Sequence, residues 1–266
     1  MTALHALTEL TTTEVEHFIS HGWLLVRQLI ASDIVAELVP RIQASIMDDG
    51  NPSGSFLLKD SPRGGATARI FTPRYQRVIA DLCGPGADIG MDGLGYMPIR
   101  FPRPSKEPRP SKNPQPWAPI ELHVDGIHFH HHIDSPEQAL VAVEIWTDID
   151  PGGGGTAIIP GSHRRVAAIL AGHEPAGLDC HALGRLAREA CVDLAPIEAR
   201  GNAGDVLFMH PHVLHGSSTN TTARTRIAGN RSVWLDRPLP YVAPGTGGWS
   251  PVALAIHQAV AVKSVC

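Results

Sequence analysis

The sequence predicts a mainly β protein, a sandwich or a barrel, with helices packed outside the β core. Over residues 120–240, short apolar segments alternate with Gly and Pro turns, which is typical of closely spaced strands. Residues 1–90 carry apolar side chains mostly at helical spacing, and a helical insertion is expected at about 164–190. With 266 residues, 43% of them hydrophobic and 18% charged, we expect one globular domain spanning 1–266.

The first 90 residues predict three helices and one strand. Residues 12–22 combine a Thr cap, early Glu residues and a closing Gly, the start and stop signals of a short helix. The apolar residues 23–29 predict a strand. A second helix is expected over 32–50, where apolar residues recur every three or four positions, and a third over 75–82, before the Gly-Pro-Gly at 84–86.

Residues 102–119 are rich in Pro and can neither continue a sheet nor build a helix. We expect a loop, either a surface insertion or a flexible lid over a pocket. After this loop the sequence predicts seven strands, in the segments 120–126, 139–149, 156–160, 192–200, 205–209, 213–217 and 226–235.

Charge and cysteine usage exclude several classes of protein. The chain has 22 basic and 26 acidic side chains, a net charge of −4, and no Lys/Arg run, so neither nucleic acid nor an anionic membrane is an expected partner. The N-terminus lacks the pattern of a secretion signal and no long apolar run occurs, which predicts a cytoplasmic protein. The 4 cysteines are widely spaced and are expected to be reduced. The 15 histidines are the unusual feature, because histidine is a common metal ligand.

The segment 120–125 alternates apolar and polar residues, so Glu121, His123 and Asp125 are expected on one face of a strand. An imidazole and a carboxylate two residues apart can bind the same ion. Such a pair alone is more often part of an ordinary surface strand, so a metal site needs a third ligand from elsewhere.

His215 is the best candidate for that ligand, because an apolar strand runs toward it from Gly204. If residues 210–215 are extended, His215 lies on one face of the strand and His210 and His212 lie on the other. The ligand is then expected to be His215, or else the pair His210 and His212. Two histidines and one carboxylate on a β scaffold form the facial triad of non-haem Fe(II) oxygenases. A catalytic Zn²⁺ with the same ligands is the competing interpretation.

Four separated stretches together resemble the phytanoyl-CoA dioxygenase (PhyH-like) family of Fe(II)/2-oxoglutarate oxygenases. They are LTTTEVEHFISHGWLLVRQLI at 10–30, HVD at 123–125, PGGGGTAIIPGSHR at 151–164 and GDVLFMHPHVLHGSSTNTTARTR at 204–226. The resemblance implies a double-stranded β-helix, which is a cupin-like jelly-roll barrel with helices outside. Within it, 1–90 would be a mainly helical support and 120–240 the barrel core.

The same resemblance implies roles for individual residues. Iron would be held by His123, Asp125 and His215. Arg226 lies at the offset of the family's Arg, whose guanidinium binds the far carboxylate of 2-oxoglutarate in a bidentate manner. Ser217 resembles the family's hydroxyl contact to that carboxylate, and Arg224 is the substitute if Arg226 is not used.

Other conspicuous residues have structural interpretations. We expect Gly152–Gly155 to be a turn, since no Lys-Ser/Thr pair follows as it would in a phosphate loop. His163 is expected to pack in a turn, and Trp146 either packs in the core or borders the cosubstrate cavity. A solvated loop or the wall of a substrate pocket is expected to hold His128, His130, His131 and His132.

By resemblance, 2-oxoglutarate and O₂ would be consumed at Fe(II), and a hydrogen atom would be abstracted from a small-molecule substrate, giving hydroxylation, epimerisation or ring closure. Halogenation is disfavoured because Asp125 is present. The Ala-, Gly- and Pro-rich composition suggests an actinomycete, and the chain is similar to antibiotic-tailoring oxygenases such as those of nogalamycin-type anthracyclines. The alternatives are a Zn-dependent hydrolase or isomerase and a non-catalytic small-molecule-binding barrel. The sequence leaves monomer and homodimer equally open.

Overall fold

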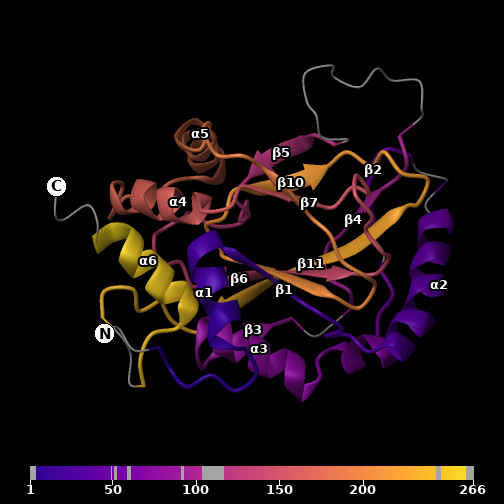
Figure 1. Ribbon diagram of the computed structural model, residues 1–266, viewed down its shortest axis with the longest axis horizontal. Coiled ribbons are helices and arrows are strands. Elements are labelled where there is room, and N and C mark those ends of the chain that lie inside the picture. Colours follow the sequence, from indigo (N-terminus) through magenta and orange to yellow (C-terminus); the bar gives the residue numbers. More distant parts are fainter. Residues whose placement is uncertain are drawn as a thin grey trace.

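The computed structural model describes residues 4–48, 50, 53–58, 61–90, 93–103, 117–243 and 247–261. Two antiparallel sheets face each other, and helices surround them (Figure 1). In the view of Figure 1, β5, β10 and β7 lie above β6, β1 and β11, and α2 and α3 lie outside the lower sheet. The predicted mainly β jelly roll with flanking helices is confirmed.

The larger sheet has seven strands in the order β1-β9-β6-β11-β4-β2, with β3 also paired to β11. Its strands are β1 Trp23–Val26, β2 Ser55–Leu58, β3 Ala87–Ile89, β4 Met97–Arg100, β6 Leu140–Ile145, β9 Val206–Met209 and β11 Arg226–Leu235. The smaller sheet has four strands in the order β5-β10-β7-β8. They are β5 Pro119–His123, β7 Thr156–Ile158, β8 Ile197–Ala199 and β10 His215–Ser218.

Two cores follow from the alternation of side chains along the larger sheet. On β6, Val141 and Val143 face the smaller sheet and form a core inside the barrel. Leu140 and Ala142 face the other way, into a larger core between the sheet and the helices. The central strands are therefore apolar on both faces, which explains their continuous apolar sequences.

Local signals in the sequence set the helix ends. The first helix begins at a capping box, in which Thr11 and Glu14 bind each other's backbone N–H groups, and it ends at Gly22 in a left-handed conformation. Asp179 caps α5 by accepting hydrogen bonds from two backbone N–H groups. The helices are α1 Thr12–His21, α2 Ser32–Asp48, α3 Pro73–Cys83, α4 Ser162–Ala171, α5 Cys180–Ala190 and α6 Pro251–Ala261, with a 3₁₀ helix at Gly65–Ile70.

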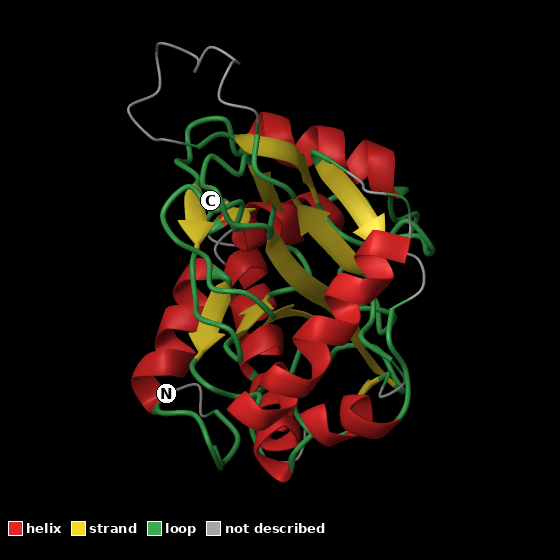
Figure 2. Cartoon of the chain, turned by 90° about the vertical axis from the view of Figure 1, so that its right-hand side faces the viewer, coloured by secondary structure: helices red, strands yellow, loops and turns green. Residues whose placement is uncertain are grey.

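Several elements were not predicted. Residues 1–90 contribute β2 and β3 to the larger sheet in addition to the expected strand β1, and β4 and α6 had no predicted counterpart. Seen from the side, helices lie against the sheets (Figure 2). Of the Pro-rich segment 102–119, residues 104–116 lie outside the described residues, so the lid prediction stays a prediction. Among the described helices, none has the length and apolar character needed to cross a bilayer.

Candidate metal and anion site

Strand pairing brings the two predicted histidine ligands together. In the ladder between β5 and β10, His123 is the direct partner of His215, and their ring centroids are 4.7 Å apart. Asp125 follows β5 and approaches both rings. Its Oδ1 lies 3.1 Å from Nε2 of His123, and its Oδ2 lies 3.5 Å from Nε2 of His215. The nearest ligand atoms of the three residues all lie within 4.8 Å of one another.

Both imidazoles are oriented in the same way by the backbone. Nδ1 of His123 donates to the carbonyl of Glu121 at 2.6 Å, and Nδ1 of His215 donates to the carbonyl of Val213 at 3.0 Å. With the proton on Nδ1, each Nε2 presents a lone pair toward Asp125. This tautomer is the one that binds a metal through Nε2.

With neutral imidazoles, three electron-pair donors converge on one point and need a cation between them; that cation can be a metal ion or a proton carried by an imidazole. Burial favours the neutral acid of Asp125, yet the charges of the two imidazoles hold its pKa well below its usual range. Burial opposes protonation of His123, but the hydrogen bond and charge of Asp125 outweigh it and raise the pKa of this histidine. Two imidazole nitrogens and a carboxylate suit a divalent transition metal.

A bulge in β5 builds this geometry. Glu121 has a left-handed backbone with φ +52°, and the register between β5 and β10 shifts between His215 and Ser217. The strict alternation predicted for 120–125 is therefore wrong, because the bulge turns the Glu121 carbonyl toward His123. Gly216 on β10 leaves room for the bulged strand, since a Cβ at this position would lie 2.3 Å from the carbonyl oxygen of Ile120.

Asn230 of β11 fixes the carboxylate from the opposite sheet. Its Nδ2 donates to Oδ2 of Asp125 at 3.3 Å. The backbone of Asn230 is paired with that of Tyr96 by two hydrogen bonds, of 2.6 and 2.9 Å. A side chain on the larger sheet thus holds one of the candidate ligands that approach from the smaller sheet.

The buried guanidinium of Arg226, further along the same face of β11, lies beside the partly buried guanidinium of Arg100. Arg226 is 3% exposed, and its backbone is the direct partner of Arg100 on β4. Nη1 of Arg226 donates to the carbonyl of Pro98 at 2.7 Å, and Nη2 lies 3.4 Å from the hydroxyl of Thr156. Arg100 donates through Nη2 to the hydroxyl of Ser217. The predicted residues Arg226 and Ser217 thus meet through Arg100.

Among the described residues, no carboxylate forms an ion pair with either arginine, and the Nε atoms of both are buried without a hydrogen bond. Burial and the neighbouring charge of Arg100 lower the pKa of Arg226 to about 9, although Glu198 opposes the shift. Burial also lowers the pKa of Arg100. Neighbouring cations with unused N–H donors are chemically suited to bind a small carboxylate.

The four-glycine run binds an internal carboxylate. Gly152–Gly155 is a turn, as predicted, and the backbone N–H groups of Gly152 and Gly155 donate to Glu198 at 2.7 and 3.2 Å. Ser218 donates to the same carboxylate at 2.6 Å. Glu198 is therefore held by neutral donors, which leaves the guanidinium pair free for another anion.

The structure corrects two details of the sequence reasoning. Residues 210–214 form a turn and are not extended, so strand parity does not select the ligand. His210 and His212 are nevertheless turned away into a buried cluster near His163. Arg224 is not a substitute for Arg226, because it lies at the surface and donates to Asp148 at 3.1 Å.

The remaining candidates have structural surroundings. Trp146 is 1% exposed and packs in the larger core, as one of its two predicted surroundings required. His163 is buried and pairs with the carbonyl of Ile19. Three of the four clustered histidines fasten their loop: His130 binds the carbonyl of Ala176, His131 that of Gly126, and His132 the carboxylate of Glu174. His128 is exposed.

Sequence reasoning missed Arg100, Asn230 and Gly216. Arg100 ends the short alternating run Met97–Arg100, which was a weak strand signal directly before the Pro-rich segment. Asn230 shares a face of β11 with Arg226 at an even spacing of four residues, so strand parity offered a signal for it. No local signal marks Gly216, because its role depends on the pairing of two distant strands.

Comparisons with known proteins agree with this geometry. The phytanoyl-CoA dioxygenase (PhyH) family model matches residues 106–228. None of the curated proteins matches the chain by sequence. Among solved structures, the chain is similar to EctD from S. alaskensis, with a TM-score of 0.55 and 17% identity over 88% of this chain and 81% of that one.

The chain is also similar to two further solved structures. SnoK, a non-haem alpha-ketoglutarate-dependent carbocyclase from nogalamycin biosynthesis, has a TM-score of 0.53 and 15% identity, over 88% of this chain and 89% of that one. HygX from Streptomyces hygroscopicus, solved with nickel, 2-oxoglutarate and hygromycin B bound, has a TM-score of 0.53 and 16% identity, over 85% of this chain and 88% of that one. At these identities the likeness establishes the shared fold.

Proposed function

Because the chain carries a phytanoyl-CoA dioxygenase domain, we propose that it is a non-haem Fe(II)- and 2-oxoglutarate-dependent oxygenase that attacks a C–H bond of a small molecule. His123, Asp125 and His215 would hold the iron. Arg226, Arg100 and Ser217 would bind the far carboxylate of 2-oxoglutarate. The stretch of the chain that matches the family model, residues 106–228, contains all of these residues except Arg100.

The observation that carries the proposal is the pair of neighbouring arginines. A metal cluster alone is equally compatible with a zinc-dependent hydrolase. Hydrolysis at a metal does not in itself require a second, cationic site, whereas a 2-oxoglutarate-dependent reaction requires one for the far carboxylate. Arg226 and Asn230 are four residues apart on one face, about 13 Å along the strand. The long side chain of Arg226 can cover part of this separation, so a dicarboxylate with one end on the metal would direct its other end toward the arginines.

The residues of the chain then have defined tasks. The backbone carbonyls of Glu121 and Val213 keep the lone pairs of the imidazoles directed at the ion. Asn230 holds the carboxylate of Asp125 in place. The arginines orient 2-oxoglutarate by a charge-assisted, planar contact. When bound, iron, 2-oxoglutarate and O₂ supply the oxidising power that removes a hydrogen atom from the substrate, with release of succinate and CO₂.

For the substrate we propose a small specialised metabolite. Support comes from two similar folds, one from nogalamycin biosynthesis and the other solved with hygromycin B bound. The side of His123 away from the core is open, since its side chain is 48% exposed, and a substrate can approach from there. Hydroxylation, epimerisation and ring closure are all reactions open to such a site.

The test is anaerobic reconstitution with Fe(II) and 2-oxoglutarate, followed by O₂. We expect a metal-to-ligand charge-transfer band before O₂ is added and succinate release afterwards. In His123→Ala both should disappear, whereas His128→Ala, which changes an exposed histidine of the adjacent loop, should retain both. Absence of the band in the wild-type protein, or succinate release unchanged in His123→Ala, would refute the proposal. Activity with Zn²⁺ and no O₂ would establish the hydrolase or isomerase alternative.

A further inference from the structure

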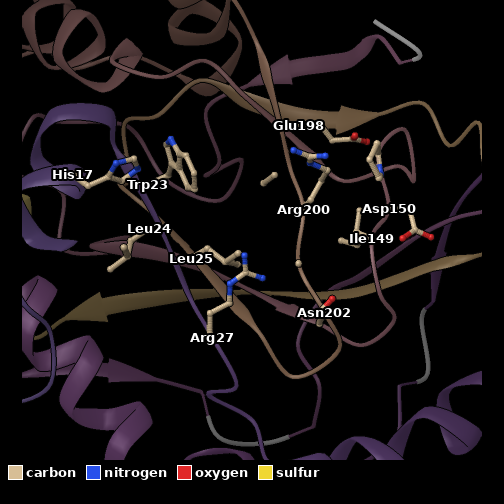
Figure 3. Close-up of a pocket in the computed structure, with 13 residues that line it drawn as sticks. His17, Trp23, Leu24, Leu25, Arg27, Ile149, Asp150, Glu198, Arg200 and Asn202 are labelled. Atoms are coloured by element: carbon tan, nitrogen blue, oxygen red, sulfur yellow. The ribbon is translucent and has the colours of Figure 1, made fainter. Parts of the chain in front are cut away.

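A cavity lies away from the candidate metal site, on the side of the barrel where the edges of the two sheets meet. It has a volume of about 620 Å³ and is lined by α1, β1, the end of β8 and the turn at 149–151. Figure 3 shows Trp23 and His17 together at one side of this cavity, and Arg27 and Arg200, which directly follow β1 and β8, at other positions around it. None of the residues that line it belongs to the His-Asp-His cluster or to the guanidinium pair.

The unequal sizes of the two sheets create the cavity. The larger sheet continues past β9 to β1, while the smaller sheet ends at β8. Trp23 and Leu25 on β1 face the barrel interior, where they pack against its apolar core, but no strand lies over them and they are only partly buried. A recess with an apolar floor therefore remains between the two edges.

The charges around this recess leave one cation without a partner. Arg27 donates to Asp205 at 2.8 Å, and Asp150 lies 3.9 Å from Arg224. The Glu198 carboxylate is held by Ser218 and by two backbone N–H groups. Among the described residues, the guanidinium of Arg200 alone of these lining charges has neither an ion-pair nor a hydrogen-bond partner.

The floor favours a flat or apolar body. Trp23 meets His17 edge-on with ring centroids 4.7 Å apart, and its indole Nε1 has no hydrogen-bond partner. Burial and the neighbouring His21 lower the pKa of His17, so this side of the recess carries no charge at neutral pH. The recess thus combines an aromatic and aliphatic floor with one free cation at its edge.

We propose that this cavity binds a small monoanion with an aromatic or otherwise apolar body, at a site separate from the metal. The anion would pair with Arg200, and the body would lie on Trp23 and Leu25. An amphipathic carboxylate or sulfonate meets both requirements. A dication or a neutral sugar would leave the guanidinium unpaired.

The probe for the test is 8-anilinonaphthalene-1-sulfonate, a monoanion with an aromatic body, titrated by fluorescence into the whole protein. We expect saturable binding at one site. Arg200→Gln should weaken the binding about tenfold or more, the loss expected for a charge-assisted contact. Arg200→Lys keeps the charge and should stay close to wild type. Arg185→Gln, which makes the same charge change on the exposed face of α5, should have no effect.

Two results would overturn the inference. One is equal affinity for the probe in the wild-type protein and Arg200→Gln. The other is displacement of the probe by 2-oxoglutarate in the presence of Fe(II), because the probe would then occupy the metal site. Arg200 is exposed and directly follows β8, so thermal unfolding of each variant should match the wild type and make the comparison valid.

Discussion

Replacing Arg226 by Met should stabilise the protein while abolishing its affinity for 2-oxoglutarate. Arg226 is buried as a charged group without a carboxylate partner. Burial and the charge of Arg100 lower its pKa from 12.5 to about 9. At 1.36 kcal/mol for each pKa unit, keeping this guanidinium charged in the folded protein costs about 5 kcal/mol.

Part of that cost is offset by contacts that the Met variant loses. Nη1 donates to Pro98 at 2.7 Å, and the contact to Thr156 at 3.4 Å is weak, so together they contribute about 3 kcal/mol. Arg226→Met should therefore be about 2 kcal/mol more stable than the wild type. For a chain of this length that is a rise of about 4–8 °C in Tm. Replacement of buried ionic groups by apolar ones of similar size gives gains of this order.

The assay is thermal and denaturant unfolding at pH 7.5. Stability is compared in the metal-free protein, and 2-oxoglutarate binding is measured as the additional stabilisation when Fe(II) and 2-oxoglutarate are added. The control is Arg224→Met, because Arg224 is half exposed and paired with Asp148, so its loss should change neither stability nor binding appreciably. The reasoning fails if Arg226→Met is less stable than the wild type, or if it keeps the stabilisation by 2-oxoglutarate.

The gain in stability should not depend on pH near neutrality. Burial and the charge of Arg100 lower the pKa of Arg226, but a guanidinium stays protonated over the working range of the protein. The advantage of Arg226→Met should therefore be the same from pH 6.5 to 8.5. An advantage that disappears within this range would contradict the assignment to the charge of Arg226.

Three further predictions concern the construction of the site and the core. Gly216→Ala places a Cβ 2.3 Å from the Ile120 carbonyl oxygen and should push β5 away from β10, weakening Fe(II) binding about a hundredfold in anaerobic titration. Ser217→Ala removes the hydroxyl that accepts from Arg100 and should raise the KM for 2-oxoglutarate about tenfold while iron affinity is unchanged. Burial lowers the pKa of His163 from 6.5 to about 4, so its neutral form stabilises the fold above pH 6.5. Between pH 6.5 and 5 the protein should lose about 2 kcal/mol through this residue, a loss absent from His163→Gln when unfolding is followed against pH.

The glycine and histidine predictions each have a matched comparison. Gly184→Ala on α5 meets only the flexible end of Arg188 and should leave iron binding unchanged. His173→Gln alters an exposed histidine and should keep the wild-type pH dependence. If Gly216→Ala binds iron normally, the bulge is not what positions His123. An equal loss of iron and 2-oxoglutarate in Ser217→Ala would place this serine at the metal and not at the carboxylate.

Local sequence patterns sufficed for most of the elements. The cap at Thr11, the left-handed Gly22 and the apolar runs of β6, β9 and β11 act within a few residues of chain, where steric preference and burial decide the conformation. The strands β2, β3 and β4 were not predicted, because glycines adjoin β2 and β3 and Pro98 interrupts β4. They form because pairing with neighbouring strands of the larger sheet supplies their hydrogen bonds.

By itself, the sequence determined the residue types of the site: a histidine and an aspartate two positions apart, a distal histidine, and an arginine eleven residues later. Only the tertiary structure decided how they meet. The bulge at Glu121 and the open space at Gly216 set the distance between His123 and His215, and Arg100 reaches the site by pairing with Arg226 across 126 residues of chain. The physical reason is that burial, not sequence proximity, makes an unpaired guanidinium an anion site, and burial is a property of the packed sheets.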